Sequence, residues 1–240
     1  MPIIGIVGRN YQEKDLDINV IGFGEYVRRS VINTGGTPFG ILPPQNVNYY
    51  EEVPSKLDKL TDHDKKIIIE QLDLCDGIII PGGLKRFEYD IFVLKYALEN
   101  DIPVFGICLG MQIFAMLNKD GEMVLNSKKI ESNINHCELD KEFVHNVIID
   151  KESIIYKITN KEKLLVNSRH NLEITNPETF KIYGKSEDGV VELIERHDKR
   201  FAVGVQWHPE ILAVNGDIDS IKIMEYFIKK ADEYKNENKI

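Results

Sequence analysis

The first half of the chain alternates short apolar runs with amphipathic stretches. The apolar runs are four or five residues long, rich in Ile and Val and bounded by Gly or Pro, as buried strands commonly are; they cover 3–7, 39–42, 77–80 and 103–107. The stretches between them repeat apolar residues at spacings of three and four, which predicts helices over 19–34, 64–74 and 89–99. Strands that alternate with helices through short connections predict a parallel sheet with helices on both faces.

The second half has a different pattern, in which short β-like segments follow one another directly. These segments cover 142–149, 163–167, 180–186, 190–195 and 201–206, and they predict antiparallel or mixed additions to the same sheet. The polar stretch 118–140 is expected to be irregular. The lysine-rich segment 157–163 and a charged helical tail from about 229 to 240 are expected to face solvent, and the helix end is expected to fray. No domain boundary is evident, so we expect one domain over 1–240.

Composition then narrows the class of protein. With 240 residues, 42% of them hydrophobic, the chain is long enough to bury a substantial core, which excludes disorder, collagen and coiled coil. A net charge of −9 argues against binding nucleic acid or an anionic membrane. The apolar start at 1–8 is too short and too poor in basic residues for a signal peptide. Three cysteines, Cys75, Cys108 and Cys137, without C-x-x-C spacing predict a reducing cytoplasm.

The strongest chemical signal is the sequence G-I-C-L-G at 106–110. It directly follows a strand-like run and precedes an apolar helical segment at 111–117, which is the arrangement of a nucleophile elbow with small residues on either side of the reactive one. At the first turn of a helix, the thiolate of Cys108 is favoured by backbone N–H groups and the helix dipole. The N–H of Leu109 is then placed to stabilise an oxyanion. The alternative is a buried core cysteine between two packing glycines.

A cysteine nucleophile needs a base, and His208 is the best placed of six histidines. It opens the sequence H-P-E at 208–210, immediately after a strand-like run. In an extended chain residues i and i+2 point to the same side, so Glu210 can hold one imidazole nitrogen and leave the other for Cys108. The alternative is a surface turn in which both side chains meet only solvent.

A third block is P-G-G at 81–83, at the end of another strand-like run. Backbone amides between glycines can approach a bound group closely, which makes Gly83 a candidate second oxyanion donor. On its own the block is a weak signal and is more typical of a plain loop. All three blocks stand at strand ends, and ligands of open parallel sheets gather at the carboxyl edge.

Together these blocks resemble the three signature blocks of the class I glutamine amidotransferase superfamily. Within it, the chain is most similar to the branch of free-standing γ-glutamyl hydrolases typified by γ-glutamyl-γ-aminobutyrate hydrolase. That closer resemblance rests on P-I-I-G-I at 2–6, on G-G-T-P at 35–38 leading to Leu42 and Pro43, and on V-N-S-R-H at 166–170.

The resemblance implies an α/β, flavodoxin-like fold with an open, mostly parallel sheet, and it implies roles for individual residues. Cys108 is the nucleophile, His208 the general base and then acid, and Glu210 the residue that orients it, with the oxyanion hole at the backbone of Gly83 and Leu109. The implied substrate contacts are Gln112 with the glutamyl group and Ser168 and Arg169 with its α-amino and α-carboxylate groups. A helix-surface position for Gln112 and a surface salt bridge for Arg169 are the alternatives. His170 is expected to be a structural hydrogen-bonding residue.

The function expected is hydrolysis of a γ-glutamyl amide through a γ-glutamyl thioester, with no metal or organic cofactor. Leu109, where many branch members carry Arg, and the short loop 84–88 bear on which amine is released. The main alternative is a glutaminase subunit that delivers ammonia to a separate synthetase, which is the only case that needs a synthetase partner. A non-enzymatic ligand-binding relative and a folate-type polyglutamate hydrolase are further alternatives, the latter disfavoured by the missing secretory signal. Otherwise the expected partner is the small-molecule substrate, with a homodimer left open.

Overall fold

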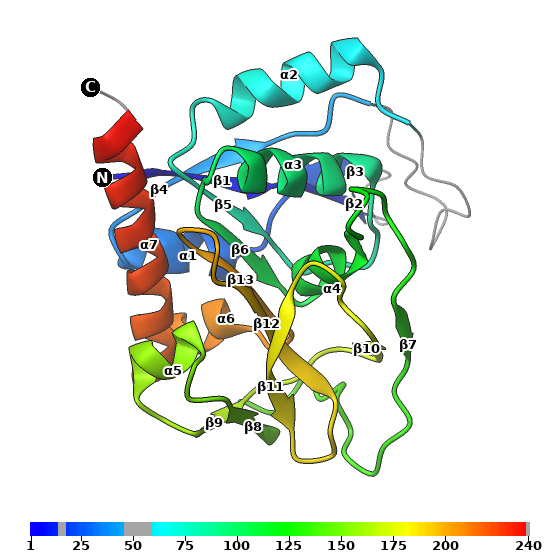
Figure 1. Cartoon of the computed structure of the whole chain (residues 1–240), viewed down its shortest axis with the longest axis vertical. Helices are drawn as coiled ribbons and strands as arrows, with labels where there is room; N and C mark the ends of the chain where they lie inside the picture. The colour runs from blue at the N-terminus through cyan, green and yellow to red at the C-terminus, as the bar shows by residue number, and fades with distance from the viewer. Residues whose placement is uncertain (14–17, 46–58, 239–240) are drawn as a thin grey trace.

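A nine-stranded sheet forms the centre of the molecule in the computed structural model, which describes residues 1–13, 18–45 and 59–238 (Figure 1). In spatial order its strands are β4 (Thr37–Ile41), β1 (Ile3–Val7), β5 (Gly77–Ile80), β6 (Val104–Ile107), β13 (Ala202–Val205), β12 (Val191–Arg196), β11 (Lys181–Ser186), β8 (His145–Ile149) and β9 (Lys163–Val166).

The sheet changes character halfway across. The strands from β4 to β13 are parallel to one another, and those from β12 to β9 are added antiparallel. Every residue of β5, β6 and β13 is buried, whereas β9 alternates exposed and buried residues. Continuous apolar runs therefore form the central parallel strands, and runs that alternate apolar and polar residues form peripheral strands with one solvent-exposed face. The predicted fold class, a mostly parallel α/β sheet with antiparallel additions, is confirmed.

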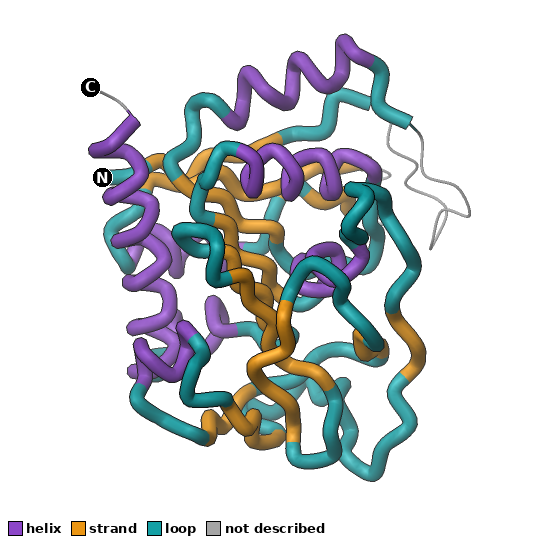
Figure 2. The backbone as a smooth tube through the Cα atoms, viewed as in Figure 1, coloured by secondary structure: helices purple, strands orange, loops and turns teal. Residues whose placement is uncertain are grey.

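Helices cover both faces of this sheet (Figure 2). One apolar core lies under α2 (Asp62–Leu72), α3 (Glu88–Glu99) and α4 (Leu109–Met116). The other lies under α1 (Glu25–Asn33), α5 (Ile154–Thr159), α6 (Pro209–Val214) and α7 (Ile218–Asn238). Successive residues of β5 divide between the two cores: Ile78 and Ile80 join the first and Ile79 the second, as the pleat requires.

The helix predicted over 19–34 is wrong in its first part. Residues 18–22 form β3 (Ile18–Gly22), which pairs antiparallel with β2 (Arg9–Glu13) in a separate two-stranded sheet. The helix α1 begins only at Glu25, because Gly24 is extended, with φ −64° and ψ 145°. The spacing of Val20, Phe23 and Val27 suits a helix, but cross-strand pairing outweighs that local preference.

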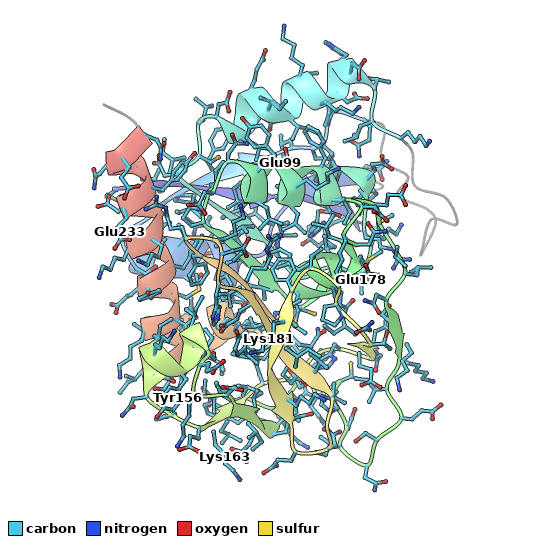
Figure 3. The ribbon with its side chains drawn as sticks, in the orientation of Figure 1. Glu99, Tyr156, Lys163, Glu178, Lys181 and Glu233 are labelled. Carbon is cyan, nitrogen blue, oxygen red and sulfur yellow. The ribbon has the colours of Figure 1, made fainter. Side chains whose placement is uncertain are left out.

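Two peripheral segments follow the expectation with small changes. The polar stretch 118–140 is mostly irregular, with one short strand, β7 (Ser127–Lys129), paired with β10 (Leu172–Ile174). The lysine-rich segment 157–163 is largely exposed, and Lys163 lies at the molecular surface in Figure 3.

The tail is more firmly attached than the charge pattern predicts. It is helical as far as Asn238, with Ala231 fully buried and Glu237 paired with Arg200; residues 239–240 lie outside the described part. Among the helices that the structure describes, none has both the length and the apolar character to cross a membrane.

Candidate active site

Cys108 stands at the turn between β6 and α4 in a strained conformation. Its φ of 53° and ψ of −104° are unusual for a residue with a side chain, and such strain is commonly found at functional positions. The neighbouring glycines make the turn sterically feasible: a Cβ on Gly110 would lie 1.9 Å from the carbonyl oxygen of Ile80, and one on Gly106 would lie 2.8 Å from the carbonyl carbon of Gly110. The predicted elbow, with obligatory small residues on both sides, is present.

His208 comes to Cys108 because their strands are neighbours. In the sheet β13 lies parallel to β6, with Val205 opposite Ile107, and the N–H of Cys108 donates to the Val205 carbonyl at 2.8 Å. His208 follows β13 at the same carboxyl edge, as the N-cap of α6. Its Nδ1 lies 2.8 Å from Glu210 Oε1, and Cys108 lies near enough for its charge to act on the imidazole. The three residues expected to act together therefore lie together.

The charges around His208 favour its protonated form. Burial alone would lower its pKa, but the negative charges of Glu210 and Cys108 outweigh that effect and raise the pKa of His208 to about 10. Glu210 is itself buried, so little water screens its interaction with the imidazole. The arrangement thus suits an imidazolium beside a nucleophilic sulfur.

The glycine pair after β5 passes directly beside this group. A Cβ on Gly82 would lie 3.0 Å from His208 Cε1 and 3.5 Å from Cys108 Cβ, and one on Gly83 would lie 3.3 Å from Leu109 Cδ2. A side chain at position 82 or 83 would be crowded by these neighbours, so glycine is required at both. The two amides expected to form an oxyanion hole, those of Gly83 and Leu109, therefore come from loops that lie side by side next to the nucleophile.

Arg9 fixes this glycine loop and was missed by the sequence analysis. Its guanidinium is almost fully buried, donates to Asp90 Oδ1 at 2.6 Å, and donates to the carbonyl oxygen of Pro81 at 3.0 Å. Asp90 also accepts the N–H of Phe87 at 2.8 Å. No local motif distinguishes Arg9; the only signal is a cation placed directly after a buried strand.

Asn167 holds the backbone of His208 and was also missed as a contributor. Its Oδ1 accepts the N–H of His208 at 2.8 Å, and its Nδ2 donates to the His208 carbonyl at 3.1 Å. The side-chain amide thus pairs with His208 as a neighbouring strand would. Its place in the V-N-S-R-H block was the available signal.

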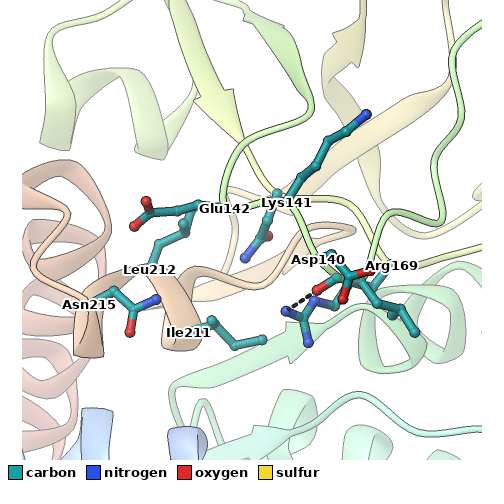
Figure 4. A pocket seen from close by; sticks show the side chains of 9 residues that line it. Asp140, Lys141, Glu142, Arg169, Ile211, Leu212 and Asn215 are labelled. Carbon is teal, nitrogen blue, oxygen red and sulfur yellow. Dashed lines mark hydrogen bonds between the residues drawn. The ribbon is translucent and has the colours of Figure 1, made fainter.

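A cavity of about 180 Å³ opens beside His208 and Glu210. Its walls come from α1, from the β2–β3 hairpin and from the loops of the site; they are Tyr11, Gly24, Tyr26, Val27, Pro81, Gly82, Arg169, His208, Glu210 and Ile211. Arg169 also borders a second cavity of about 260 Å³, where its Nη2 donates to the Leu139 carbonyl at 3.1 Å (Figure 4). Of the expected substrate contacts, Arg169 is the one that reaches the cavity beside the base.

The other two expected contacts do not line this cavity, so the role of Gln112 at the substrate also stays a prediction. Gln112 is buried on α4 and its Nε2 donates to Gln206 Oε1 at 3.2 Å, so it is not a helix-surface residue. Ser168 is fully buried, and its hydroxyl donates to the His136 carbonyl at 2.8 Å. The structure does not bring the Ser168 hydroxyl to the cavity, and its contact with substrate stays a prediction. His170 makes a hydrogen bond from Nδ1 to the Leu172 carbonyl, at 3.0 Å.

Comparison with known proteins identifies the family to which this chain belongs. The family model described as Peptidase C26 matches residues 83–210, which is more than half of the chain. A glutamine amidotransferase-like protein of Rickettsia prowazekii is 30% identical over 220 residues, covering 65% of this chain and 78% of the relative. A CTP synthase of Porphyromonas gingivalis is 34% identical over 187 residues, covering 65% of this chain and 35% of the relative.

A solved structure shows the same fold at lower identity. The glutaminase domain of a Trypanosoma brucei CTPS superposes with a TM-score of 0.64 at 20% identity, covering 97% of this chain and 94% of that domain. The chain thus spans about a third of the CTP synthase it matches and nearly the whole of a glutaminase domain. With the matched blocks in these positions, the chain belongs to the Peptidase C26 family of class I glutamine amidotransferase-like proteins.

Proposed function

We propose that the chain is a glutaminase-type cysteine hydrolase that cleaves the γ-amide of a glutamyl substrate. The observation that carries the proposal is the strained Cys108 beside His208, whose Nδ1 lies 2.8 Å from Glu210 Oε1. Such a constellation is recognised by geometry and roles. The likeness to CTP synthases favours glutamine as the amide that is cleaved, with ammonia released for a synthetase partner.

The chemistry follows from the positions of the groups. Cys108 Sγ attacks the γ-carbonyl carbon, and the N–H groups of Gly83 and Leu109 donate to the oxyanion that forms. His208, held protonated by its surroundings, gives its proton to the departing nitrogen and leaves a γ-glutamyl thioester on Cys108. His208 then takes a proton from water, which attacks the thioester and releases glutamate. Arg169 lines this cavity and offers its guanidinium to the substrate α-carboxylate.

A free-standing γ-glutamyl hydrolase is the second candidate. The observation that favours it is the aromatic part of the cavity wall. Tyr11 and Tyr26 are half-exposed side chains there, and they offer a departing amine larger than ammonia a surface to pack on. The assignment to the hydrolase branch remains a prediction. Under either function we propose a single domain over 1–240 in the cytoplasm.

The test is turnover by two cysteine variants. Cys108→Ala removes the nucleophile, so we expect glutamate release to fall by about 10⁴-fold or more with thermal unfolding unchanged. Cys137→Ala, a matched control at a half-buried cysteine outside the site, should keep wild-type turnover. More than a tenth of wild-type activity in Cys108→Ala would refute the mechanism.

The same assay separates the two candidates when glutamine and γ-glutamyl amides of larger amines are compared. Release of ammonia from glutamine at a low rate by the chain alone supports the glutaminase. Faster cleavage of the larger amides without any partner supports the free-standing hydrolase.

A further inference from the structure

Three histidines and a glutamate meet in the antiparallel half of the molecule, in a group that the proposed catalysis does not use. His136 comes from the polar stretch 118–140, His145 from β8, His170 from the V-N-S-R-H block and Glu192 from β12. All four are at most 4% exposed. One nitrogen or carboxylate oxygen from each lies within 4.8 Å of all the others.

In the His136–His145–His170–Glu192 cluster, the distances from Glu192 to the three histidines match the spacing of neighbouring ligands around one metal ion. Glu192 Oε1 lies 3.4 Å from His136 Nδ1, 3.5 Å from His145 Nε2 and 3.3 Å from His170 Nε2. Zinc bonds of about 2.0–2.2 Å in a tetrahedral site place neighbouring ligand atoms about 3.3–3.6 Å apart. Within the described part of the chain, both carboxylate oxygens of Glu192 and the Nε2 atoms of His145 and His170 are buried without a hydrogen-bond partner.

The outer nitrogen of each imidazole faces an acceptor. The three contacts are His136 Nε2 with Asp188 Oδ2 at 2.9 Å, His170 Nδ1 with the Leu172 carbonyl at 3.0 Å, and His145 Nδ1 with the Asn146 carbonyl at 3.4 Å. Carbonyl and carboxylate oxygens cannot donate, so the ring proton belongs on the outer nitrogen. In a neutral imidazole the inner nitrogen then carries a lone pair directed at Glu192, which is the tautomer that metal-ligating histidines adopt.

The lone pairs of three imidazole nitrogens and of the Glu192 carboxylate thus point at one buried position, where they repel one another. Two states would remove this repulsion. Either the histidines take up second protons, which places up to three imidazolium ions in a nearly water-free space, or a cation lies between them. From the geometry we propose that His136, His145, His170 and Glu192 bind one Zn²⁺. Imidazole nitrogens suit zinc and not magnesium or calcium, and a complete set of four protein ligands is typical of a structural site.

The surroundings of the cluster indicate how the ion would enter and which segments it would hold together. A cavity of about 250 Å³ at the surface is lined by His136 and His170, so the cluster borders solvent on one side. The ion would clamp stretch 118–140 to the V-N-S-R-H block, where the N–H of His170 already donates to the His136 carbonyl at 2.9 Å. Arg169 precedes His170 directly. If the proposed function holds, the zinc ligands are therefore positioning residues for the arginine that faces the substrate cavity.

The direct test is metal content, measured in the Cys108→Ala/Cys137→Ala background so that these two thiols cannot bind zinc. After zinc loading and dialysis, we expect about one zinc per chain by mass spectrometry of the metal. Glu192→Gln and His145→Gln should each lower it to less than about a fifth. His63→Gln, at an exposed histidine on α2, is the matched control and should keep full loading. Retention of zinc by both cluster variants, or no zinc in the parent, would overturn the proposal.

A second measurement needs no cluster variant and so does not depend on their folding. We expect removal of zinc from the intact chain by a chelator to lower its Tm by about 5 °C or more, and added Zn²⁺ but not Mg²⁺ to restore it. An unchanged Tm together with no uptake of zinc would overturn the proposal. Because the parent already lacks Cys108, failure of the zinc site and failure of the proposed catalysis would be seen separately.

Discussion

Cys108 combines three properties, two of which its sequence neighbours provide. The glycines at 106 and 110 permit the positive φ, the following helix directs N–H groups at the turn, and the neighbouring strand delivers His208. The first two are local and could be read from G-I-C-L-G. The third depends on β13 lying beside β6, which the spacing of the blocks indicates only through a resemblance to known proteins.

The pKa of His208 gives a prediction at this scale. Since Glu210 is the main cause that raises it, Glu210→Gln should lower the pKa of His208 from about 10 toward its ordinary value of 6.5. An NMR titration of the His208 ring in each protein measures the shift. Glu152→Gln, at an exposed glutamate, should leave the pKa near 10. The same value in Glu210→Gln as in the wild type would contradict the assigned cause.

The sign of the associated stability effect is fixed by the direction of the shift. A folded-state pKa of about 10 lies above the ordinary 6.5, so protonation of His208 stabilises the folded chain fully below about pH 6.5, and this contribution is lost as the pH rises toward 10. In Glu210→Gln most of that contribution should be absent.

At the scale of elements, the tight packing of α4 against β5 makes Gly110 the most sensitive glycine of the site. A Cβ there would lie 1.9 Å from a backbone oxygen, which cannot move without displacing the strand. We expect Gly110→Ala to destabilise the chain by about 3 kcal/mol or more and to abolish turnover. In Gly22→Ala the new Cβ would meet nothing within 4 Å, and the change should be within about 0.5 kcal/mol. Denaturant unfolding of the two variants compares them; equal stability would contradict the packing argument.

Strands and helices of the parallel half could be predicted because their signals are local. A buried run such as 77–80 and a three-four spacing such as 89–99 specify β5 and α3 within a residue. The β2–β3 pair could not, because its ladder joins residues 9–13 with residues 18–22 and its apolar spacing imitates a helix. That pair contributes Tyr11 to the site cavity, so the error concealed one wall of the proposed site.

At the scale of the whole molecule, Arg9 and Asp90 join segments 81 positions apart. Arg9→Met would leave Asp90 buried without its cation, and we expect a loss of about 3–5 kcal/mol together with lower turnover, because the Pro81 carbonyl also loses its donor. The double variant Arg9→Met/Asp90→Asn should recover part of the stability. Chemical denaturation of the three proteins measures both effects; no recovery in the double variant would contradict the paired-charge account.

At the same scale, the tertiary structure of the second half assembles a cluster that no local sequence pattern predicts. His136, His145, His170 and Glu192 lie on four separate segments, and only the closure of the antiparallel strands brings them together. No two of the four lie closer than nine positions along the chain. Likewise Ser168, expected at the substrate, is turned toward this cluster by the backbone of stretch 118–140.

The central claim is that Cys108 attacks a γ-glutamyl carbonyl, and the most direct measurement is the mass of the chain after reaction with a glutamine analogue that carries a diazoketone at the γ-position. We expect one adduct per chain, located by peptide mass spectrometry on Cys108 alone and prevented by excess glutamine or γ-glutamyl amide. Cys75 and Cys137 should be unlabelled. Labelling spread over the three cysteines, or an unlabelled Cys108 in folded protein, would contradict the account.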